Sequence, residues 1–349
     1  MAAHVRIIGS GLIGTSLGLA LRAQGFDISM VDIVPERALL AQDLVGKPGE
    51  GPAGLVVIAT PTSAFREVAE REFLLNPNAV FMDIGSVKTK PQVEIETISG
   101  FATRFCGTHP LAGREVGGPE SARGDLFAGR RWVLTPSVHT APDVIAYITK
   151  ILVALDASIV VMSHQEHDAF VALISHLPQI SASLLAGQLR GAADQAMDLS
   201  GQGLKDSTRI AASDPQLWSE ILLENRAHIL PLLEKMLTDL KKFIDGIDSP
   251  ESIKSFVEHG QEGRARIPGK HGGRARDYSF LPIVIEDKAG QLAELFNECA
   301  IAGVNIEDLS IEHSPGQFTG LITLALSSQG AQILSQHLRE RGWNVHSAR

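Results

Sequence analysis

The 349-residue chain has only two cysteines, Cys106 and Cys299. Two cysteines cannot form a disulfide framework, which fits a reducing compartment, and they are too few for a zinc cluster held by thiolates. Residues 164–168 include two histidines and two acidic side chains, but ligand-type residues so close in sequence usually face different sides of a helix. We therefore expect a cytoplasmic protein without a metal site.

The sequence also lacks an excess of positive charge and a long apolar segment. Its 31 lysines and arginines against 40 acidic residues give a net charge of −9, so no overall positive field attracts a phosphate backbone. No uninterrupted apolar run reaches the roughly 18 residues that a membrane helix needs. The apolar segment 7–21 is interrupted by glycines, which a signal peptide would not explain. We expect neither nucleic acid nor a membrane as a partner.

What the chain does have is enough apolar material for packed cores. Apolar residues make up 44% of the sequence, which excludes disorder over most of its length. A chain of 349 residues exceeds one ordinary domain of roughly 100–200 residues. Changes in the spacing of apolar residues predict three domains, at 1–162, 163–261 and 278–349, with a glycine-rich and basic linker at 262–277.

The first domain alternates short Val/Ile-rich runs with amphipathic stretches. This alternation predicts a Rossmann-like α/β domain, in which a parallel sheet carries helices on both faces. The segment between Asp32 and Leu55 is brief and rich in glycine and proline, so the usual third strand should be short or absent. The expected strands are 5–8, 28–31, 55–59, 80–84, 131–135 and 158–162.

The other two domains differ from the first in their apolar spacing. Residues 163–261 lose the strand signals and show helical spacing, which predicts an all-helical domain. Residues 278–349 show strand, helix, strand, strand, helix, strand, which is the ferredoxin-like βαββαβ plan. The helical domain has more apolar side chains than it can bury alone, so we expect a homodimer.

A strand at 5–8 runs into G-x-G-x-x-G, formed by Gly9, Gly11 and Gly14, and then into a helical stretch. The glycines permit a tight turn, close approach to a pyrophosphate and helix–strand packing, and the helix N-terminus favours phosphate. Asp32 ends the next strand, where its carboxylate can accept ribose hydroxyls and would repel a 2′-phosphate. The pattern therefore favours NAD over NADP. The residues expected around this cofactor are Gly9, Gly11, Leu12, Ile13, Gly14, Asp32, Thr60, Pro61 and Ser86.

Three clusters carry candidate chemistry. His109 lies in a loop bounded by glycine and proline, and its imidazole suits the acceptor of a hydroxyl proton while hydride leaves the same carbon. His176 lies in a second cluster, Ser-His-Leu-Pro-Gln. Lys205 and Arg209, at i and i+4, share one face if their segment is helical and could grip a carboxylate. A plain ion pairing of these cations with nearby Asp206 or Glu220 remains the alternative.

These clusters, in this order behind the glycine fingerprint, resemble the prephenate dehydrogenase family of tyrosine biosynthesis over residues 4–260. The last unit resembles an ACT domain, a module that senses small molecules. The motifs that carry the resemblance are GSVKT (85–89), GTHPLAG (107–113), HD (167–168), SHLPQ (175–179) and GLKDSTRIAASDPQLW (203–218). The pair at 167–168 is expected to hold the junction between the sheet and helical domains.

The resemblance implies NAD-dependent oxidative decarboxylation of prephenate to 4-hydroxyphenylpyruvate, with L-tyrosine as the expected effector of the ACT-like unit. It implies that His109 accepts the ring hydroxyl proton and that Ser86 orients it. Arg209 would bind a substrate carboxylate and His176 would line the pocket. The remaining implied residues are Glu115 and Lys205 near the substrate, and Asp287, Gly290 and Asn305 at the effector.

Three alternatives stay open at this point. An arogenate dehydrogenase would act on a side chain that carries an ammonium group in place of a keto group. A 3-hydroxyacid dehydrogenase would share the two-domain build but needs a catalytic lysine on its central helix and leaves GTHPLAG unexplained. A tyrosine sensor without activity would have no use for His109, Ser86 and Arg209 together.

Overall fold

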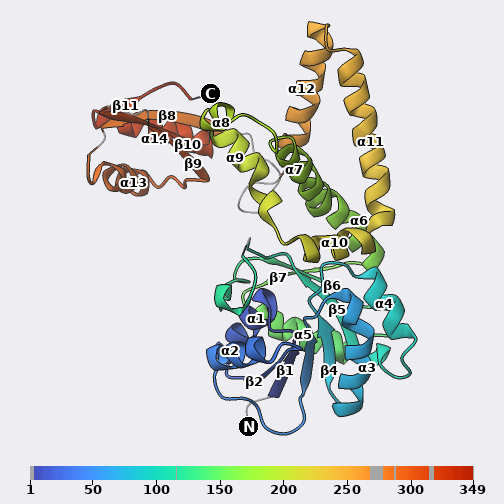
Figure 1. Ribbon diagram of the computed structural model, residues 1–349. Helices are drawn as coiled ribbons and strands as arrows, with labels where there is room; N and C mark the ends of the chain where they lie inside the picture. Colours follow the sequence, from blue (N-terminus) through green and yellow to red (C-terminus); the bar gives the residue numbers. More distant parts are fainter. Residues whose placement is uncertain (1–3, 115, 268–277, 287, 314–317, 349) are drawn as a thin grey trace. The chain divides into compact units, whose positions relative to one another are not determined.

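The computed structural model describes residues 4–114, 116–267, 278–286, 288–313 and 318–348 (Figure 1). The chain divides into two compact units, Met1–Thr238 and Asp239–Arg349. The first unit contains a seven-stranded sheet followed by helices. The second contains a four-stranded sheet with its own helices.

The first unit is built on a sheet with strand order β2-β1-β3-β4-β5-β6-β7. No further strand pairs with β2 in the described sheet, because the chain goes from β2 through one helix directly to β3 beside β1. The expectation that the usual third strand is short or absent is therefore confirmed for the described residues. The strands are β1 (His4–Ile8), β2 (Asp27–Val31), β3 (Leu55–Ile58), β4 (Val80–Asp83), β5 (Phe105–Pro110), β6 (Arg131–Thr135) and β7 (Ser158–Val161).

The expectation of a purely parallel sheet is wrong at one place. Strand β6 runs antiparallel to β5, whereas the other pairs are parallel. A parallel return needs a crossover connection, usually a helix. Between β5 and β6 the described chain has only a short 3₁₀ turn, Pro119–Ser121, so it comes back in the opposite direction.

Helices cover both faces of this sheet, as predicted (Figure 1). One apolar core includes Leu17 and Leu21 from α1 and Ile148 from α5. The other includes Phe65 from α3 and Ile95 from α4. Alternate strand residues supply the two cores because successive side chains point to opposite faces. The helices are α1 (Leu12–Ala23), α2 (Pro35–Val45), α3 (Phe65–Leu75), α4 (Thr89–Glu96) and α5 (Pro142–Ala154).

After the sheet the chain becomes helical, which confirms that prediction. Ser163 starts the first of these helices with a capping box, in which its side chain accepts from the backbone of Glu166 while the Glu166 carboxylate accepts in return. The elements are α6 (His164–Val171), a π turn (Ala172–His176), α7 (Leu177–Gly187), α8 (Asp194–Asp198), α9 (Gln202–Thr208), a 3₁₀ turn (Arg209–Ala212), α10 (Pro215–Glu224) and α11 (Arg226–Asp245).

The continuous helical stretch His164–Gly187 is long and apolar enough to cross a membrane by length and composition alone. Three polar residues within this stretch, His167, Asp168 and His176, are each about 1% exposed and each hydrogen-bonded within the first unit. A core helix of a water-soluble protein passes the same test of length and composition. The absence of a membrane partner stays a prediction.

The second unit has the predicted βαββαβ order. Its antiparallel sheet has strand order β11-β8-β10-β9, and α13 and α14 pack on a core that includes Leu295, Leu334 and Ile283. The described helix α12 continues to Ala265, so the first residues of the expected linker 262–277 are helical. Residues 268–277 lie outside the described residues. The elements are α12 (Pro250–Ala265), β8 (Tyr278–Glu286), α13 (Gln291–Ile301), β9 (Asp308–His313), β10 (Thr319–Ser327), α14 (Ser328–Glu340) and β11 (Asn344–Val345).

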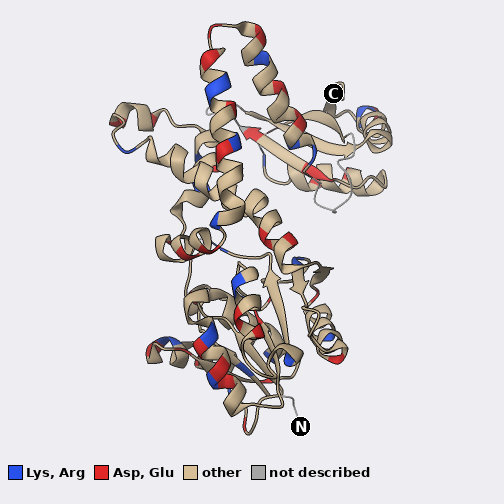
Figure 2. Cartoon of the chain, turned by 90° about the vertical axis from the view of Figure 1, so that its right-hand side faces the viewer, with Lys and Arg blue, Asp and Glu red and all other residues tan. Residues whose placement is uncertain are grey.

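The long helices α11 and α12 carry charges of both signs. Figure 2 shows these basic and acidic positions intermixed along the two helices. This mixing is what a solvated helix face typically shows.

We expect Gly14→Ala to lower stability, by about 1–3 kcal/mol, as overpacking does. A Cβ at Gly14 would overlap the carbonyl oxygen of Gly9, where α1 meets the glycine loop. Thermal and urea unfolding measure the loss. Gly11→Ala is the matched control, because a Cβ there meets nothing within 4 Å. Equal stability of the two variants would contradict the packing argument.

Candidate active site

The glycine loop between β1 and α1 has the geometry that the fingerprint predicts. Gly9 has φ 110°, which favours glycine, and a Cβ there would overlap the carbonyl oxygen of Ala59 after β3. Gly11 precedes α1 with open space around it, so its backbone can be approached closely. Leu12 and Ile13 form the first turn of α1. The free N–H groups of that turn can donate to phosphate oxygens.

Asp32 follows β2 and ties this loop down. One of its carboxylate oxygens accepts from the Ser10 backbone N–H at 2.7 Å, and the other accepts from the Val34 N–H at 2.9 Å. Each carboxylate oxygen has a second lone pair, so Asp32 can still accept from sugar hydroxyls.

Several buried hydroxyls around the loop lack a hydrogen-bond partner among the described residues. They are those of Ser10, Thr15 and Thr60. Buried polar groups are nearly always satisfied in a working structure, so unpaired hydroxyls gathered near a glycine loop fit a polar ligand. Thr60 and Pro61 follow β3 directly after Ala59, which lies against Gly9. The residues present therefore fit a dinucleotide.

His109 lies near the carboxyl end of β5 on a rigid buried platform. The residue before it, Thr108, donates its backbone N–H to Asp83 at 3.0 Å and accepts from the Trp132 indole at 3.0 Å. Lys88 pairs with the Asp83 carboxylate and donates to the Thr108 carbonyl at 2.7 Å. Burial lowers the pKa of Lys88, although Asp83 beside it opposes that shift. These contacts hold β5 against β4 at Thr108, the residue before His109.

His109 and His167 are hydrogen-bonded to each other. The distance from His109 Nδ1 to His167 Nε2 is 2.8 Å, and the two rings meet edge to face. Burial lowers the pKa of His109 well below its usual value of 6.5, and the neighbouring His167, Lys88 and His176 lower it further, against Asp168. A neutral imidazole in this position can accept a proton.

Asp168 joins the helical region of the first unit to the sheet, as expected for this pair of residues. Its carboxylate accepts from the backbone N–H groups of Lys88 and Thr89, both at 2.8 Å, and from His167 Nδ1 at 2.7 Å. Burial raises the pKa of Asp168, but the hydrogen bonds from His167, Thr89 and Lys88 outweigh it and bring the pKa to about 2. Asp168 is therefore ionised at neutral pH.

His176, at the end of the π turn, lies in the same network. The Asn225 side-chain nitrogen is 3.0 Å from His176 Nδ1 and donates to the Asp168 carbonyl at 2.7 Å. The ring also contacts Trp218 edge to face. Burial lowers the pKa of His176 to about 4, against the opposing effect of Asp168.

The segment with Lys205 and Arg209 is helical, as its spacing requires, and both side chains are exposed. The Ser213 hydroxyl, 3.4 Å from the Gln179 amide oxygen, links this segment to α7 and so to the SHLPQ motif. The nearby Asp206 accepts from Gln202, and Glu220 accepts from Gln216. The predicted substrate residue Glu115 lies outside the described residues.

Ser86 lies in the loop between β4 and α4 and is half-buried. In the described part of the chain the hydrogen-bond partner of the His109 ring is His167, and no hydrogen bond joins His109 to Ser86. The orienting role expected of Ser86 stays a prediction. The sequence predicts only a domain-junction role for His167, because its contact with His109 joins residues 58 positions apart and leaves no signal in their spacing.

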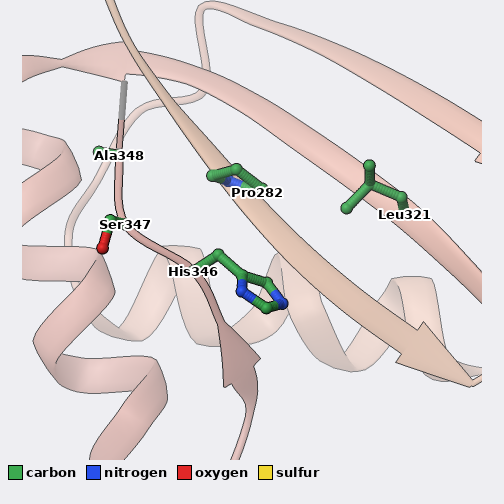
Figure 3. A pocket seen from close by; sticks show the side chains of 5 residues that line it. All are labelled: Pro282, Leu321, His346, Ser347 and Ala348. Atoms are coloured by element: carbon green, nitrogen blue, oxygen red, sulfur yellow. The ribbon is translucent and has the colours of Figure 1, made fainter.

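Two of the residues expected at the effector, Gly290 and Asn305, lie in the second unit. Gly290 has φ 92° immediately before α13, and the Asn305 amide donates to Glu307 at 3.2 Å. Asp287 lies outside the described residues. A surface hollow of about 520 Å³ lies elsewhere, where the β8 residue Pro282 and the β10 residue Leu321 meet the chain after β11 (Figure 3). Neither Gly290 nor Asn305 lines it. The hollow is lined by Pro282, Leu321, His346, Ser347 and Ala348.

Comparison with known proteins identifies the family. Residues 17–161 match the nucleotide-binding domain of prephenate dehydrogenase, and residues 163–262 match its dimerization domain. The chain belongs to the prephenate dehydrogenase family. It is 30% identical to the probable prephenate dehydrogenase NovF of Streptomyces niveus, over 98% of this chain and 99% of that protein.

Two solved structures are similar to about three quarters of this chain. One is prephenate dehydrogenase from A. aeolicus in complex with hydroxyphenyl propionate and NAD⁺, with 29% identity and a TM-score of 0.68 over 76% of this chain and 96% of that one. The other is Synechocystis arogenate dehydrogenase, with 27% identity and a TM-score of 0.61 over 76% and 100%. These matches confirm the predictions of an oxidoreductase of the prephenate dehydrogenase family and of a nucleotide-binding domain.

We expect His109 to remain neutral until the pH falls well below 6.5, because burial of the ring, and after it the neighbouring His167 and Lys88, disfavour the charged form. A histidine-selective NMR titration measures this pKa. The spectrum of His109→Asn identifies the signal by its loss. A midpoint at or above 6.5 would contradict the burial of the ring.

Proposed function

We propose that this protein oxidises prephenate with NAD and releases carbon dioxide, forming 4-hydroxyphenylpyruvate for L-tyrosine biosynthesis. The observation that carries the proposal is a half-buried His109, with a lowered pKa, at the carboxyl end of β5. Strands β1, β3, β4 and β5 are parallel, so the glycine loop after β1 opens at the same sheet edge as His109. Ligands of such sheets bind at that edge.

The residues divide the chemistry among them. NAD, when bound, takes up the hydride. The hydride leaves the ring carbon that carries the hydroxyl group. His109 accepts the proton of that hydroxyl at Nε2, so the carbon becomes a carbonyl carbon. Loss of carbon dioxide then makes the ring aromatic. The platform of Asp83, Lys88 and Thr108 holds the base in place. Preference for NAD over NADP follows from Asp32, which would repel a 2′-phosphate.

Substrate recognition needs cations, since prephenate carries two carboxylates. Arg209 supplies a planar guanidinium for a bidentate grip and Lys205 a second positive charge one turn away. His176, neutral through burial, offers a polar but uncharged wall. An acidic chain can thus hold a dianion through a few local groups.

Arogenate is a second candidate substrate, favoured by the similarity to the Synechocystis arogenate dehydrogenase structure. Arogenate carries an ammonium group where prephenate carries a keto group. A carboxylate facing that end would favour arogenate. Relative kcat/KM for the two substrates decides between them.

We further infer that the protein is a homodimer regulated by L-tyrosine. The match to a dimerization domain supports the dimer, as do large apolar side chains exposed on α6, the π turn, α7 and α11. These side chains include Phe170, Leu173, Ile174, Leu184 and Leu237. The βαββαβ topology of the second unit supports an ACT-like module, with Gly290 and Asn305 near the expected effector site.

The deciding experiment supplies the purified protein with prephenate or arogenate, each with NAD or NADP, and follows reduced nicotinamide by absorbance. We expect turnover of prephenate with NAD, slowed by added L-tyrosine. His109→Asn should lower kcat by about 10²-fold or more, the usual contribution of a positioned base. His139→Asn, at an exposed histidine of the same unit, is the control. No turnover with any combination would refute the activity.

Arg209→Ala should raise KM for prephenate by about 10–100-fold, because a charge-assisted hydrogen bond contributes about 1.5–3 kcal/mol. The free energy of unfolding should change little, since Arg209 is exposed. Steady-state kinetics with Arg190→Ala, another exposed arginine of the helical region, provide the comparison. An unchanged KM would remove Arg209 from substrate binding.

A further inference from the structure

We propose that His167 and Asp168 determine which ring nitrogen of His109 carries its proton, so that Nε2 is left as the base. Both are positioning residues, since they act through His109. The inference deepens the proposed function and rests on it for the catalytic consequence. The proton position itself can be measured without substrate.

The first step is the charge of Asp168. Its carboxylate is 1% exposed and accepts three hydrogen bonds, two from the backbone of Lys88 and Thr89 and one from His167. An ionised carboxylate can only accept. His167 Nδ1, at 2.7 Å from Asp168 Oδ1, must therefore carry a hydrogen.

The second step passes this constraint to His109. In a neutral imidazole one nitrogen donates and the other accepts. We take His167 to be neutral, so its hydrogen on Nδ1 leaves a bare Nε2 at 2.8 Å from His109 Nδ1. His109 Nδ1 must then be the donor, and His109 Nε2 keeps its lone pair. His167 is 1% exposed, so water does not compete for its ring nitrogens.

The third step is the charge that forms when His109 takes up a proton. The imidazolium keeps its Nδ1–H bond to His167, whose other nitrogen remains paired with the Asp168 anion. In Ser-His-Asp triads the carboxylate contacts the base directly, and loss of the correct tautomer lowers kcat by about 10⁴-fold. Here a second imidazole stands between the carboxylate and the base. The buried chain His109–His167–Asp168 gives the base both its tautomer and a compensating negative charge.

Nitrogen NMR of the histidine rings, in the full chain without substrate, tests the proton position. We expect the wild-type His109 ring to carry its hydrogen on Nδ1, and His167→Leu to remove that preference. A wild-type hydrogen on Nε2 would overturn the proposal. A His109 tautomer in His167→Leu identical to that of the wild type would also overturn it. Both outcomes are independent of whether prephenate is the substrate.

Kinetics of matched variants then test the consequence. His167→Leu removes the acceptor and should lower kcat by about 10²-fold or more, with KM for prephenate and NAD little changed. His167→Gln places an amide oxygen near the former Nε2 and should restore kcat to within about tenfold of wild type. His164→Leu, one turn earlier on α6, should leave kcat unchanged. Loss of kcat in His167→Gln equal to that in His167→Leu, or no loss in either, would contradict a positioning role.

A wild-type protein inactive on every substrate and cofactor pair would refute the proposed function instead.

Discussion

The first unit depends on one buried carboxylate. The carboxylate of Asp168, on α6, accepts hydrogen bonds from the backbone N–H groups of Lys88 and Thr89, where α4 begins. A residue of the helical region therefore caps a helix of the sheet region. The same carboxylate accepts from His167, which contacts His109. One anion therefore satisfies backbone donors that would otherwise be buried without partners, and orients the ring system beside the candidate base.

A second buried charge fixes the other side of the base. Lys88 and Asp83 form an ion pair that is almost fully buried, and both also bond to Thr108. Such a pair is costly to desolvate and contributes little net stability, so its value lies in geometry. It clamps the carboxyl ends of β4 and β5 together. His109 is thus held from the strand side by Lys88 and Asp83 and from the helix side by His167.

Much of the cofactor site could be predicted from the sequence, because it is local. The glycines, the helix after them and Asp32 lie within 24 residues, and each has a conformational or chemical reason to be the residue type it is. Gly9 needs a positive φ, and Gly14 allows no Cβ. The antiparallel direction of β6 could not be predicted, because apolar spacing is the same in either direction. Strand direction depends on whether the connection before the strand contains a crossover helix.

The sequence by itself determined the glycine loop, the alternation of strands and helices, the helical region after Val161 and the βαββαβ order of the second unit, since all of these follow from neighbours along the chain. Only the tertiary structure decided that His167 is the partner of His109 and that Asp168 caps α4. These contacts join residues 58 and 80 positions apart. Hydrogen bonds between such residues depend on how helices pack against a sheet, and no spacing along the chain encodes that.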